Sequence, residues 1–204
     1  SVDSSANYCK SHPLTGGKQI VCENWRNIIS VGARPLAITN CLNFGNPENS
    51  EVMGEFAECL DGIKEACEFL NYPVVSGNVS FYNGTNKKNI FPTPVIGGVG
   101  LIKKLSKPMN HYFKSEKSNI LLIGKTFGHL EQSCFLKENF SIVEGVPPEI
   151  NLVNEKNNGE IKVFLEDYVY LCLLLITLYE LENDTESLNI CQELMLKAWD
   201  LFYN

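Results

Sequence analysis

Residues Leu36–Val75, LAITNCLNFGNPENSEVMGEFAECLDGIKEACEFLNYPVV, carry a strand pattern, a helix pattern and a second strand pattern in succession. Leu36–Leu42 is short and apolar, as a buried strand is. A turn-rich loop follows at Asn43–Asn49, and apolar residues then recur every three or four positions from Val52 to Leu70. This spacing predicts a long amphipathic helix. Strand, helix and strand in this order predict a parallel βαβ unit.

The ends of this helix also carry signals. Ser50 is a suitable N-cap, and Glu51 suits the positive end of the helix dipole. Pro73 ends the helix, and Val74–Val75 begins the next strand.

Toward the N-terminus the signals are weaker. Ser1–Leu14 has no helical period and indicates a strand end plus loop, and Thr15–Gly17 indicates a turn. Lys18–Ser30 carries one apolar face and predicts a helix, for which Gly32 is the expected stop.

Toward the C-terminus, Val95–Ile102 predicts a further strand, whose glycines favour close strand packing. Lys103–Ser118 is polar and irregular, so we expect a domain boundary there, with one α/β domain at 1–105 and a second at 116–204. The second would start with a strand at Asn119–Ile123, followed by helices at Leu130–Lys137, Asn151–Tyr170 and Leu188–Phe202.

The composition limits the possible functions. The 204 residues are 44% hydrophobic with a formal net charge of −7, which is typical of a folded domain and untypical of a nucleic-acid-binding protein. The longest apolar run, Tyr168–Tyr179, is shorter than the ~20 residues that a membrane span needs. Ser1–Lys10 lacks the apolar core of a signal peptide, and the eight cysteines include no C-x-x-C pair. We therefore expect a cytoplasmic protein with reduced, buried thiols that binds neither nucleic acid nor membrane.

Two polar clusters follow the strands of the predicted unit. The first, Thr39–Pro47, contains three asparagines and a glycine at the end of a buried strand, where ligands of α/β sheets commonly bind. Asn40 could donate and accept hydrogen bonds to a nucleotide without adding charge. An ordinary Asn/Gly/Pro turn explains the same residues.

The second cluster, Ser76–Asn83, follows the next strand. Gly77 would let the backbone approach a ligand closely, and Asn78 could offer a neutral oxygen to Mg²⁺. Ser80 could bond a substrate phosphate. A polar loop without function remains the alternative.

Two other patterns are weak. Gly124–Lys125–Thr126 lacks the upstream glycine of a phosphate loop, since position 119 is Asn. His129 and Cys134 are five residues apart, which separates them on a helix and disfavours a catalytic dyad.

The two clusters belong to longer motifs. Gly32–Pro47 and Pro73–Asn83 resemble segments of the phosphoribosylformylglycinamidine synthases, the ATP-dependent amidine-forming ligases of purine biosynthesis. Gly16–Lys18, Arg26–Asn27 and Pro92–Pro94 also fit, and the resemblance covers about residues 1–160. It places the chain in the later half of such a synthase.

This resemblance implies an activity and a set of site residues. The family phosphorylates formylglycinamide ribonucleotide with ATP, and ammonia from a glutaminase subunit then displaces phosphate to give the amidine. The resemblance assigns ATP contacts to Asn40, where many members carry Asp, and to Gly77. It assigns a Mg²⁺ ligand to Asn78 and a substrate contact to Ser80. The family's catalytic His belongs to the earlier half, so the resemblance assigns no catalytic residue here.

The resemblance also implies the architecture: a partial AIR-synthetase-like ATP-binding domain of mixed α/β type, followed by its second α/β domain. The family assembles with a glutaminase subunit and a small accessory subunit. An Asp- and Gly-rich segment of the second domain is missing around Asp167–Leu175. Because the family's catalytic His belongs to the earlier half, the fragment alone is expected to be inactive.

Two other functions stay open. The chain could be a structural half-domain that supports an active site elsewhere, or a related enzyme such as aminoimidazole ribonucleotide synthetase or selenophosphate synthase. Separately from these functions, an incomplete sheet is expected to leave an exposed edge that favours a homodimer or association with the missing half.

Overall fold

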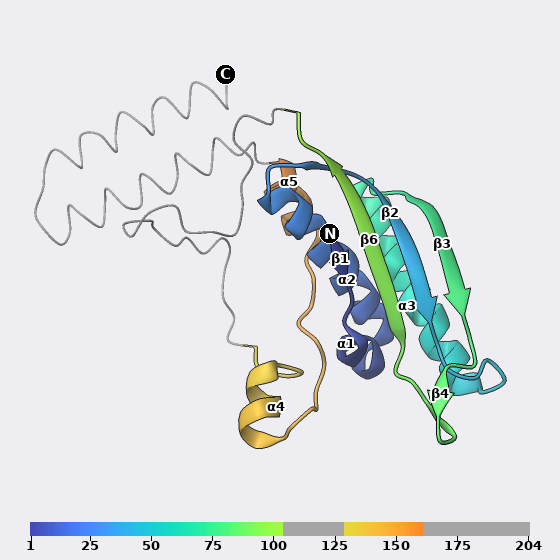
Figure 1. The fold of residues 1–204 in the computed structure, drawn as a ribbon. Coiled ribbons are helices and arrows are strands. Elements are labelled where there is room, and N and C mark those ends of the chain that lie inside the picture. Colours follow the sequence, from blue (N-terminus) through green and yellow to red (C-terminus); the bar gives the residue numbers. More distant parts are fainter. Residues whose placement is uncertain (104–128, 161–204) are drawn as a thin grey trace, which may run out of the picture. The chain divides into compact units, whose positions relative to one another are not determined.

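The computed structural model describes residues 1–103 and 129–160, the last four without their side chains (Figure 1). Apart from the final turn of one helix, these residues belong to a single compact unit. The predicted strand Asn119–Ile123, the segment Gly124–Thr126 and the helix Leu188–Phe202 lie outside the described residues, as do most of the predicted domain boundary and the region around Asp167–Leu175.

A four-stranded sheet forms the centre of this unit, and its strand order is β1-β6-β2-β3. The strands are β1 (Val2–Asp3), β2 (Arg34–Asn43), β3 (Val74–Ser80) and β6 (Thr93–Leu101). β2 and β3 are parallel, as the βαβ prediction requires, and β6 runs antiparallel to both of its neighbours. A small hairpin, β4 (Gly84–Thr85) with β5 (Lys88–Asn89), connects β3 to β6.

Helices cover one face of the sheet. Figure 1 shows α2 (Pro13–Ser30) and α3 (Ser50–Leu70) side by side behind the strands, with the short α1 (Ala6–Ser11) at their end. The predicted mixed α/β class is confirmed. Among the described residues, no helix is both long enough and apolar enough to cross a membrane.

The N-terminal predictions need two corrections. Ala6–Ser11 is helical, and Thr15–Gly17 lies inside α2 and does not form a turn. Pro13 occupies the first turn of α2, where its missing N–H costs nothing, and the His12 ring caps the helix by accepting from the Thr15 N–H. The glycines favour a turn locally, but here they serve tight helix packing.

α3 differs from its prediction only at the start. Its N-cap is Asn49, whose Oδ1 accepts from the Glu51 N–H at 2.8 Å, so Ser50 is the first helical residue and the prediction of a Ser50 cap is wrong. At the other end Asn71 adopts the left-handed conformation, with φ of 52°, and its N–H bonds back to the Cys67 and Glu68 carbonyls. Gly32 similarly follows the end of α2 with φ of 79°, as predicted.

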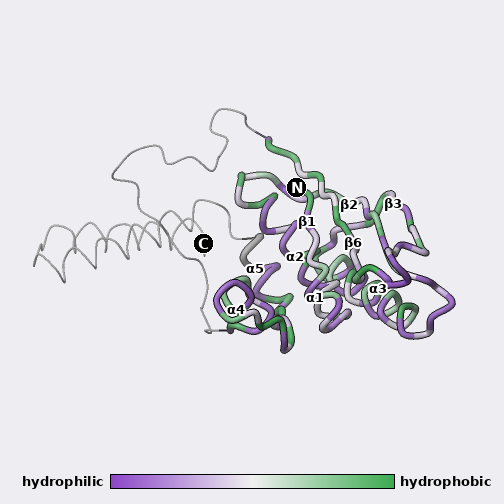
Figure 2. The backbone as a smooth tube through the Cα atoms, turned by 60° about the horizontal axis from the view of Figure 1, so that its bottom comes forward, coloured by the Kyte–Doolittle hydropathy of each residue, from purple (hydrophilic) through white to green (hydrophobic). Residues whose placement is uncertain are grey.

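The hydrophobic core fills the space between the helices and the sheet. In Figure 2 hydrophobic stretches alternate with hydrophilic ones along the helices and strands of this unit. Four of the predicted buried thiols are in the core, and every cysteine within 1–103 and 129–160 is free. The fully or nearly fully buried residues include Cys9, Ile20, Val21, Cys22, Ile28, Ile38, Leu42, Phe44, Cys59, Ile63, Ala66, Cys67, Leu70, Tyr72 and Ile96.

Two glycines let α2 and α3 approach each other closely. A Cβ at Gly17 would overlap the Cys59 carbonyl oxygen, and a Cβ at Gly62 would overlap the Leu14 carbonyl oxygen. The helix backbones therefore touch at positions where any larger residue would push them apart.

The segment after residue 128 packs back onto α2. Gln19 donates to the Pro148 carbonyl, and Arg26 pairs with Glu155 at 2.8 Å. Helix α4 (Cys134–Phe140) starts four residues later than the predicted Leu130, because Ser133 caps it by accepting from the Leu136 N–H. Helix α5 (Leu152–Glu160) begins close to the predicted start at Asn151.

Candidate functional site

The four residues predicted to bind ligands lie on β2 and β3, and they sit within the strands and not in loops after them. The register pairs Asn40 with Gly77, Cys41 with Asn78, and Asn43 with Ser80. The polar residues favour a loop by composition, but the parallel pairing satisfies their backbone and extends both strands.

Asn40 and Gly77 touch each other. A Cβ at Gly77 would overlap the Asn40 side-chain oxygen, so the carboxamide occupies the space that any other residue at 77 would need. The sequence predicted that a ligand would approach the Gly77 backbone closely; in the structure the Asn40 side chain makes that close approach.

The Asn40 side chain also borders a cavity of about 510 Å³ between β2–β3 and the second half of α3. Its lining combines a buried apolar floor, which includes Ile63, Cys67 and Tyr72, with an exposed charged rim at Asp61, Lys64 and Glu68. This combination of apolar floor and few polar groups is typical of small-molecule sites. The remaining lining residues are Leu60, Asn71, Pro73 and Val74.

The thiol in this cavity is not activated. Burial raises the pKa of Cys67 from its ordinary value to about 12, and the nearby Glu68 carboxylate adds to the shift. A thiol with such a pKa stays protonated at neutral pH and is a poor nucleophile. Cys67 therefore acts as an apolar lining residue.

Asn78 and Ser80 face the other side of the sheet. Successive side chains of a strand point to opposite faces, so Asn78 and Ser80 share one face of the sheet while Gly77 is on the other, against the Asn40 carboxamide. Asn78 is exposed. The Ser80 hydroxyl bonds to the Asn83 side chain, and Asn83 Nδ2 in turn donates to the Phe44 carbonyl at 3.1 Å.

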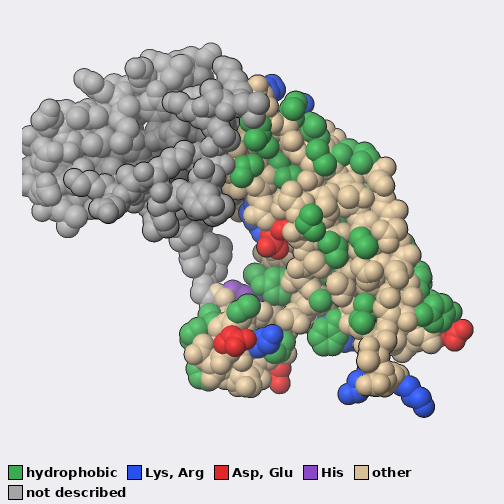
Figure 3. Space-filling view, in the orientation of Figure 1, with side chains coloured by type: hydrophobic (Ala, Val, Ile, Leu, Met, Phe, Trp, Pro, Cys, Tyr) green, Lys and Arg blue, Asp and Glu red, His purple; other side chains and the backbone are tan. Residues whose placement is uncertain are grey.

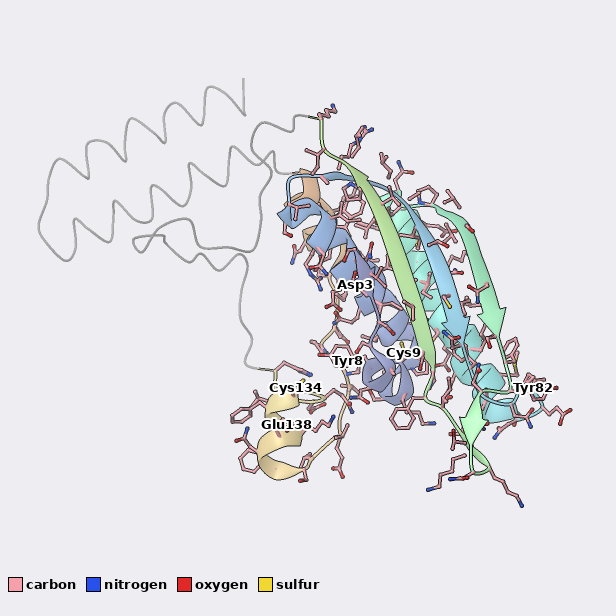
Figure 4. The ribbon with its side chains drawn as sticks, in the orientation of Figure 1. Asp3, Tyr8, Cys9, Tyr82, Cys134 and Glu138 are labelled. Carbon is pink, nitrogen blue, oxygen red and sulfur yellow. The ribbon has the colours of Figure 1, made fainter. Side chains whose placement is uncertain are left out.

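The four candidate residues thus lie close together on two adjacent strands, but their side chains are divided between the two faces of the sheet. β3 is an outer strand of the described sheet, and most of it is exposed. A ligand that lies along the free edge of β3 can therefore reach both faces. Tyr82 follows the C-terminal end of β3 and is well exposed (Figure 4).

The remaining asparagines of the first cluster have structural roles. Asn43 Nδ2 donates to the Cys41 and Thr93 carbonyls, and Asn46 Oδ1 accepts from the Glu48 N–H at 2.9 Å. For these two residues the turn interpretation is the right one.

The described residues do not by themselves build a magnesium site. Mg²⁺ in proteins is usually held by one or two carboxylates together with phosphate and water oxygens. Within residues 1–103 and 129–156, no group of three or more His, Cys, Asp or Glu side chains could hold a metal ion. Figure 3 shows few charged side chains on the helix-free face. Asn78 offers a single neutral oxygen there.

His129 and Cys134 do not form a dyad. The His129 ring bonds to the Val146 carbonyl at 2.9 Å, and Cys134 is exposed at the start of α4. This agrees with the sequence-based expectation.

Sequence reasoning missed the contribution of α3 and Tyr72 to the cavity. Leu60, Ile63, Lys64 and Cys67 recur at the spacing of one helix face, which indicated a packed helix but not that part of this face borders a cavity. The helical spacing of these residues was visible in the sequence, but the cavity becomes apparent only when the position of β3 relative to α3 is known.

Comparison with known proteins places this architecture. Residues 1–102 match the family described as AIR synthase related protein, N-terminal domain, so the chain belongs to the AIR synthase related family. Among its relatives, the phosphoribosylformylglycinamidine synthase subunit PurL of Pelagibacter ubique is 63% identical over 160 residues, and the PurL of Bradyrhizobium diazoefficiens is 55% identical over 159. The predicted AIR-synthetase-like fold and the synthase resemblance are both confirmed.

The matches are partial. The aligned region covers 78% of this chain but only 22% of either relative, so the chain spans about a fifth of their length. Among solved structures, phosphoribosylformylglycinamidine synthase II of Thermotoga maritima is 40% identical with a TM-score of 0.46, covering 48% of this chain and 17% of that one. The T. maritima PurL described as complexed with ATP is 42% identical with a TM-score of 0.45.

Proposed function

We propose that this chain is part of a phosphoribosylformylglycinamidine synthase and supplies one side of its ATP site. The whole enzyme would convert formylglycinamide ribonucleotide, ATP and ammonia from glutamine to the amidine. The observation that carries the proposal is the Asn40–Gly77 contact beside the 510 Å³ cavity, in a chain of this family.

The chemistry of the site supports nucleotide binding. The floor of the cavity is apolar, which suits the faces of a purine, and the Asn40 carboxamide offers both a donor and an acceptor. Gly77 leaves backbone close to that amide. Asn78 and Ser80, on the other face, are in our proposal the Mg²⁺ ligand and the substrate contact, reached around the free edge of β3.

Completion of the site requires further protein. Our proposal assigns no catalytic residue to this chain, and the Mg²⁺ ligands beyond Asn78 would come from phosphate, water or another part of the enzyme. We propose that the free edge of β3 pairs with a second copy or with the other half of the synthase. A glutaminase subunit, a small accessory subunit and a cytoplasmic location belong to the same proposal.

A second candidate function is structural. Asn78 offers a single neutral oxygen, and the part of the chain that the structure describes contains no group of three or more His, Cys, Asp or Glu side chains that could hold a metal ion; this favours a half-domain that supports an active site formed elsewhere. In that case the chain would hold a nucleotide without turning it over, or hold none.

Calorimetric titration of ATP with Mg²⁺ into the chain tests the proposal. We expect binding that Asn40→Ala weakens and that Asn78→Ala weakens only when Mg²⁺ is present. Asn139→Ala, an exposed asparagine on α4, is the matched control and should bind as the wild type does. Binding that is indifferent to Asn40→Ala would place the nucleotide elsewhere, and an absence of binding would favour the structural half-domain.

A further inference from the structure

One buried carboxamide links four elements of the unit. Asn24 on α2 is 0% exposed. Its Nδ2 lies 2.8 Å from Asp3 Oδ2 and 3.1 Å from the Ser1 carbonyl, both at β1, and 3.3 Å from the Ile96 carbonyl on β6. Its Oδ1 accepts from the Tyr72 hydroxyl at 2.8 Å. A single side chain therefore joins α2, β1 and β6 to the start of β3.

Tyr72 is the partner that connects this network to the candidate site. It is 0% exposed, lies two residues before Val74, where β3 starts, and lines the same cavity as Asn40. Its ring also packs edge-on against Trp25, with ring centroids 5.3 Å apart. Burial raises the pKa of the Tyr72 phenol, so its hydroxyl stays a donor well above neutral pH.

The backbone of β6 is shaped around the same hydrogen bond. A Cβ at Gly98 would overlap both Asn24 Oδ1 and Tyr72 Oη. Gly98 on β6 thus leaves room for this polar pair inside an otherwise apolar core, where an unpaired carboxamide would be costly.

We propose that Asn24 and Tyr72 are a positioning pair for the nucleotide site, and that their buried hydrogen bond fixes the start of β3 so that Gly77 stays against the Asn40 carboxamide. The pair touches no ligand itself. It acts because β3 is an outer strand, held on one side only by β2, and needs a second anchor at its first residues. This inference rests on the proposed function only where ATP affinity is measured; the effect on β3 itself does not depend on it.

Tyr72→Phe tests the proposal, because it removes the hydroxyl and keeps the ring. We expect faster amide hydrogen exchange across Val74–Ser80 and about fivefold weaker ATP binding, as the loss of one hydrogen bond predicts. Asn24→Ala should have the same two effects, and the double variant should be no worse than Asn24→Ala, since the two residues act as a unit.

Val52→Ala controls for lost stability. Val52 is buried at the other end of α3, about 27 Å along the helix from Leu70, and it does not line the cavity. The proposal is supported if Tyr72→Phe changes β3 exchange and ATP affinity more than a Val52→Ala variant with an equal loss of thermal stability. Equal effects in the two variants would overturn it.

The two proposals can fail separately. If the wild type binds ATP and Tyr72→Phe binds equally well with unchanged β3 exchange, the positioning role is wrong and the proposed function stands. If the wild type binds no ATP, the proposed function loses its support, and the exchange comparison alone decides whether the pair fixes β3.

Discussion

Gly77 has no side chain because Asn40 occupies the space where one would lie. In Gly77→Ala the new methyl group would displace the Asn40 carboxamide oxygen. We expect ATP binding to weaken about tenfold or more, with a stability loss of about 1–3 kcal/mol from overpacking. Calorimetry and urea denaturation measure the two effects. Ser76→Ala, an exposed neighbour on the same strand, should change neither, and normal ATP binding by Gly77→Ala would remove Asn40 from the site.

Buried thiols make stability depend on pH, and Cys22 and Cys67 are two of them. Burial raises the pKa of Cys22 and of Cys67 from 9.0 to about 12 in the folded protein. The unfolded chain releases these protons above pH 9, but the folded chain retains them until about pH 12. Stability is therefore full below pH 9 and falls as the pH rises from 9 to 12, by up to about 1.4 kcal/mol per pH unit for each thiol.

Urea denaturation at pH 8 and pH 10 checks this dependence. Cys67→Ala should reduce the pH slope, although it lowers stability at both values by leaving a small cavity. Tyrosines titrate in the same range, so the comparison with this variant isolates the contribution of the thiol. An identical slope in Cys67→Ala would mean that the thiol ionises equally in the folded and unfolded states.

At the scale of the element, the start of α3 distinguishes two adjacent polar residues. Asn49 caps the helix and Ser50 does not. Asn49→Ala should lower the free energy of unfolding by about 1 kcal/mol, because the Glu51 N–H loses its acceptor. Ser50→Ala should change it by less than about 0.5 kcal/mol. Thermal unfolding of the two variants decides which residue is the cap, and the reverse order would return the role to Ser50.

The same helix offers a matched pair of glycines. At Gly62 a methyl group would overlap the Leu14 carbonyl oxygen, whereas at Gly54 no heavy atom lies within 4 Å. Gly62→Ala should destabilise by roughly 1–3 kcal/mol because it separates α2 from α3. Gly54→Ala should stabilise by about 0.5–1 kcal/mol, since alanine favours the helix. Equal effects in denaturation experiments would mean that the helix crossing is looser than described.

These elements also show what the sequence allows one to predict. The spacing of apolar residues from Val52 to Leu70 identifies α3, and with Leu36–Leu42 it identifies the parallel pair β2–β3. The start of α2 could not be predicted in this way, because Gly16 and Gly17 favour a turn locally and only α1 and α3 explain their presence in a helix.

The candidate site was predictable in part. Asn40, Gly77, Asn78 and Ser80 were found through motifs, and the pairing of the two motifs follows from the βαβ order. The division of these residues between two faces depends on strand register, and the Asn24–Tyr72 bond joins residues 48 positions apart. Neither feature has a local signal in the sequence.

At the scale of the whole molecule, the sheet has an outer strand and an open face that expose apolar side chains. Val75 on β3 is 70% exposed and Val99 on β6 is 63% exposed. We expect self-association at high concentration, detected by size-exclusion chromatography with light scattering. Val75→Lys should shift the chain toward the monomer, whereas Val153→Lys, on α5, should not. A wild-type chain that stays monomeric at high concentration would exclude a second copy of this chain as the partner of this edge.

The strand order carries a consequence for how the protein is made. β6, the last of the four strands to leave the ribosome, is inserted between β1 and β2, the first two. At 5–20 residues per second, roughly 5–20 s separate the synthesis of Val2 from that of Leu101. Until then β1 has no strand to pair with and β2 lacks its antiparallel neighbour, so the nascent chain must wait with apolar strands uncovered. A transcript cut short before Thr93 should therefore yield a polypeptide that chaperones retain and proteases remove.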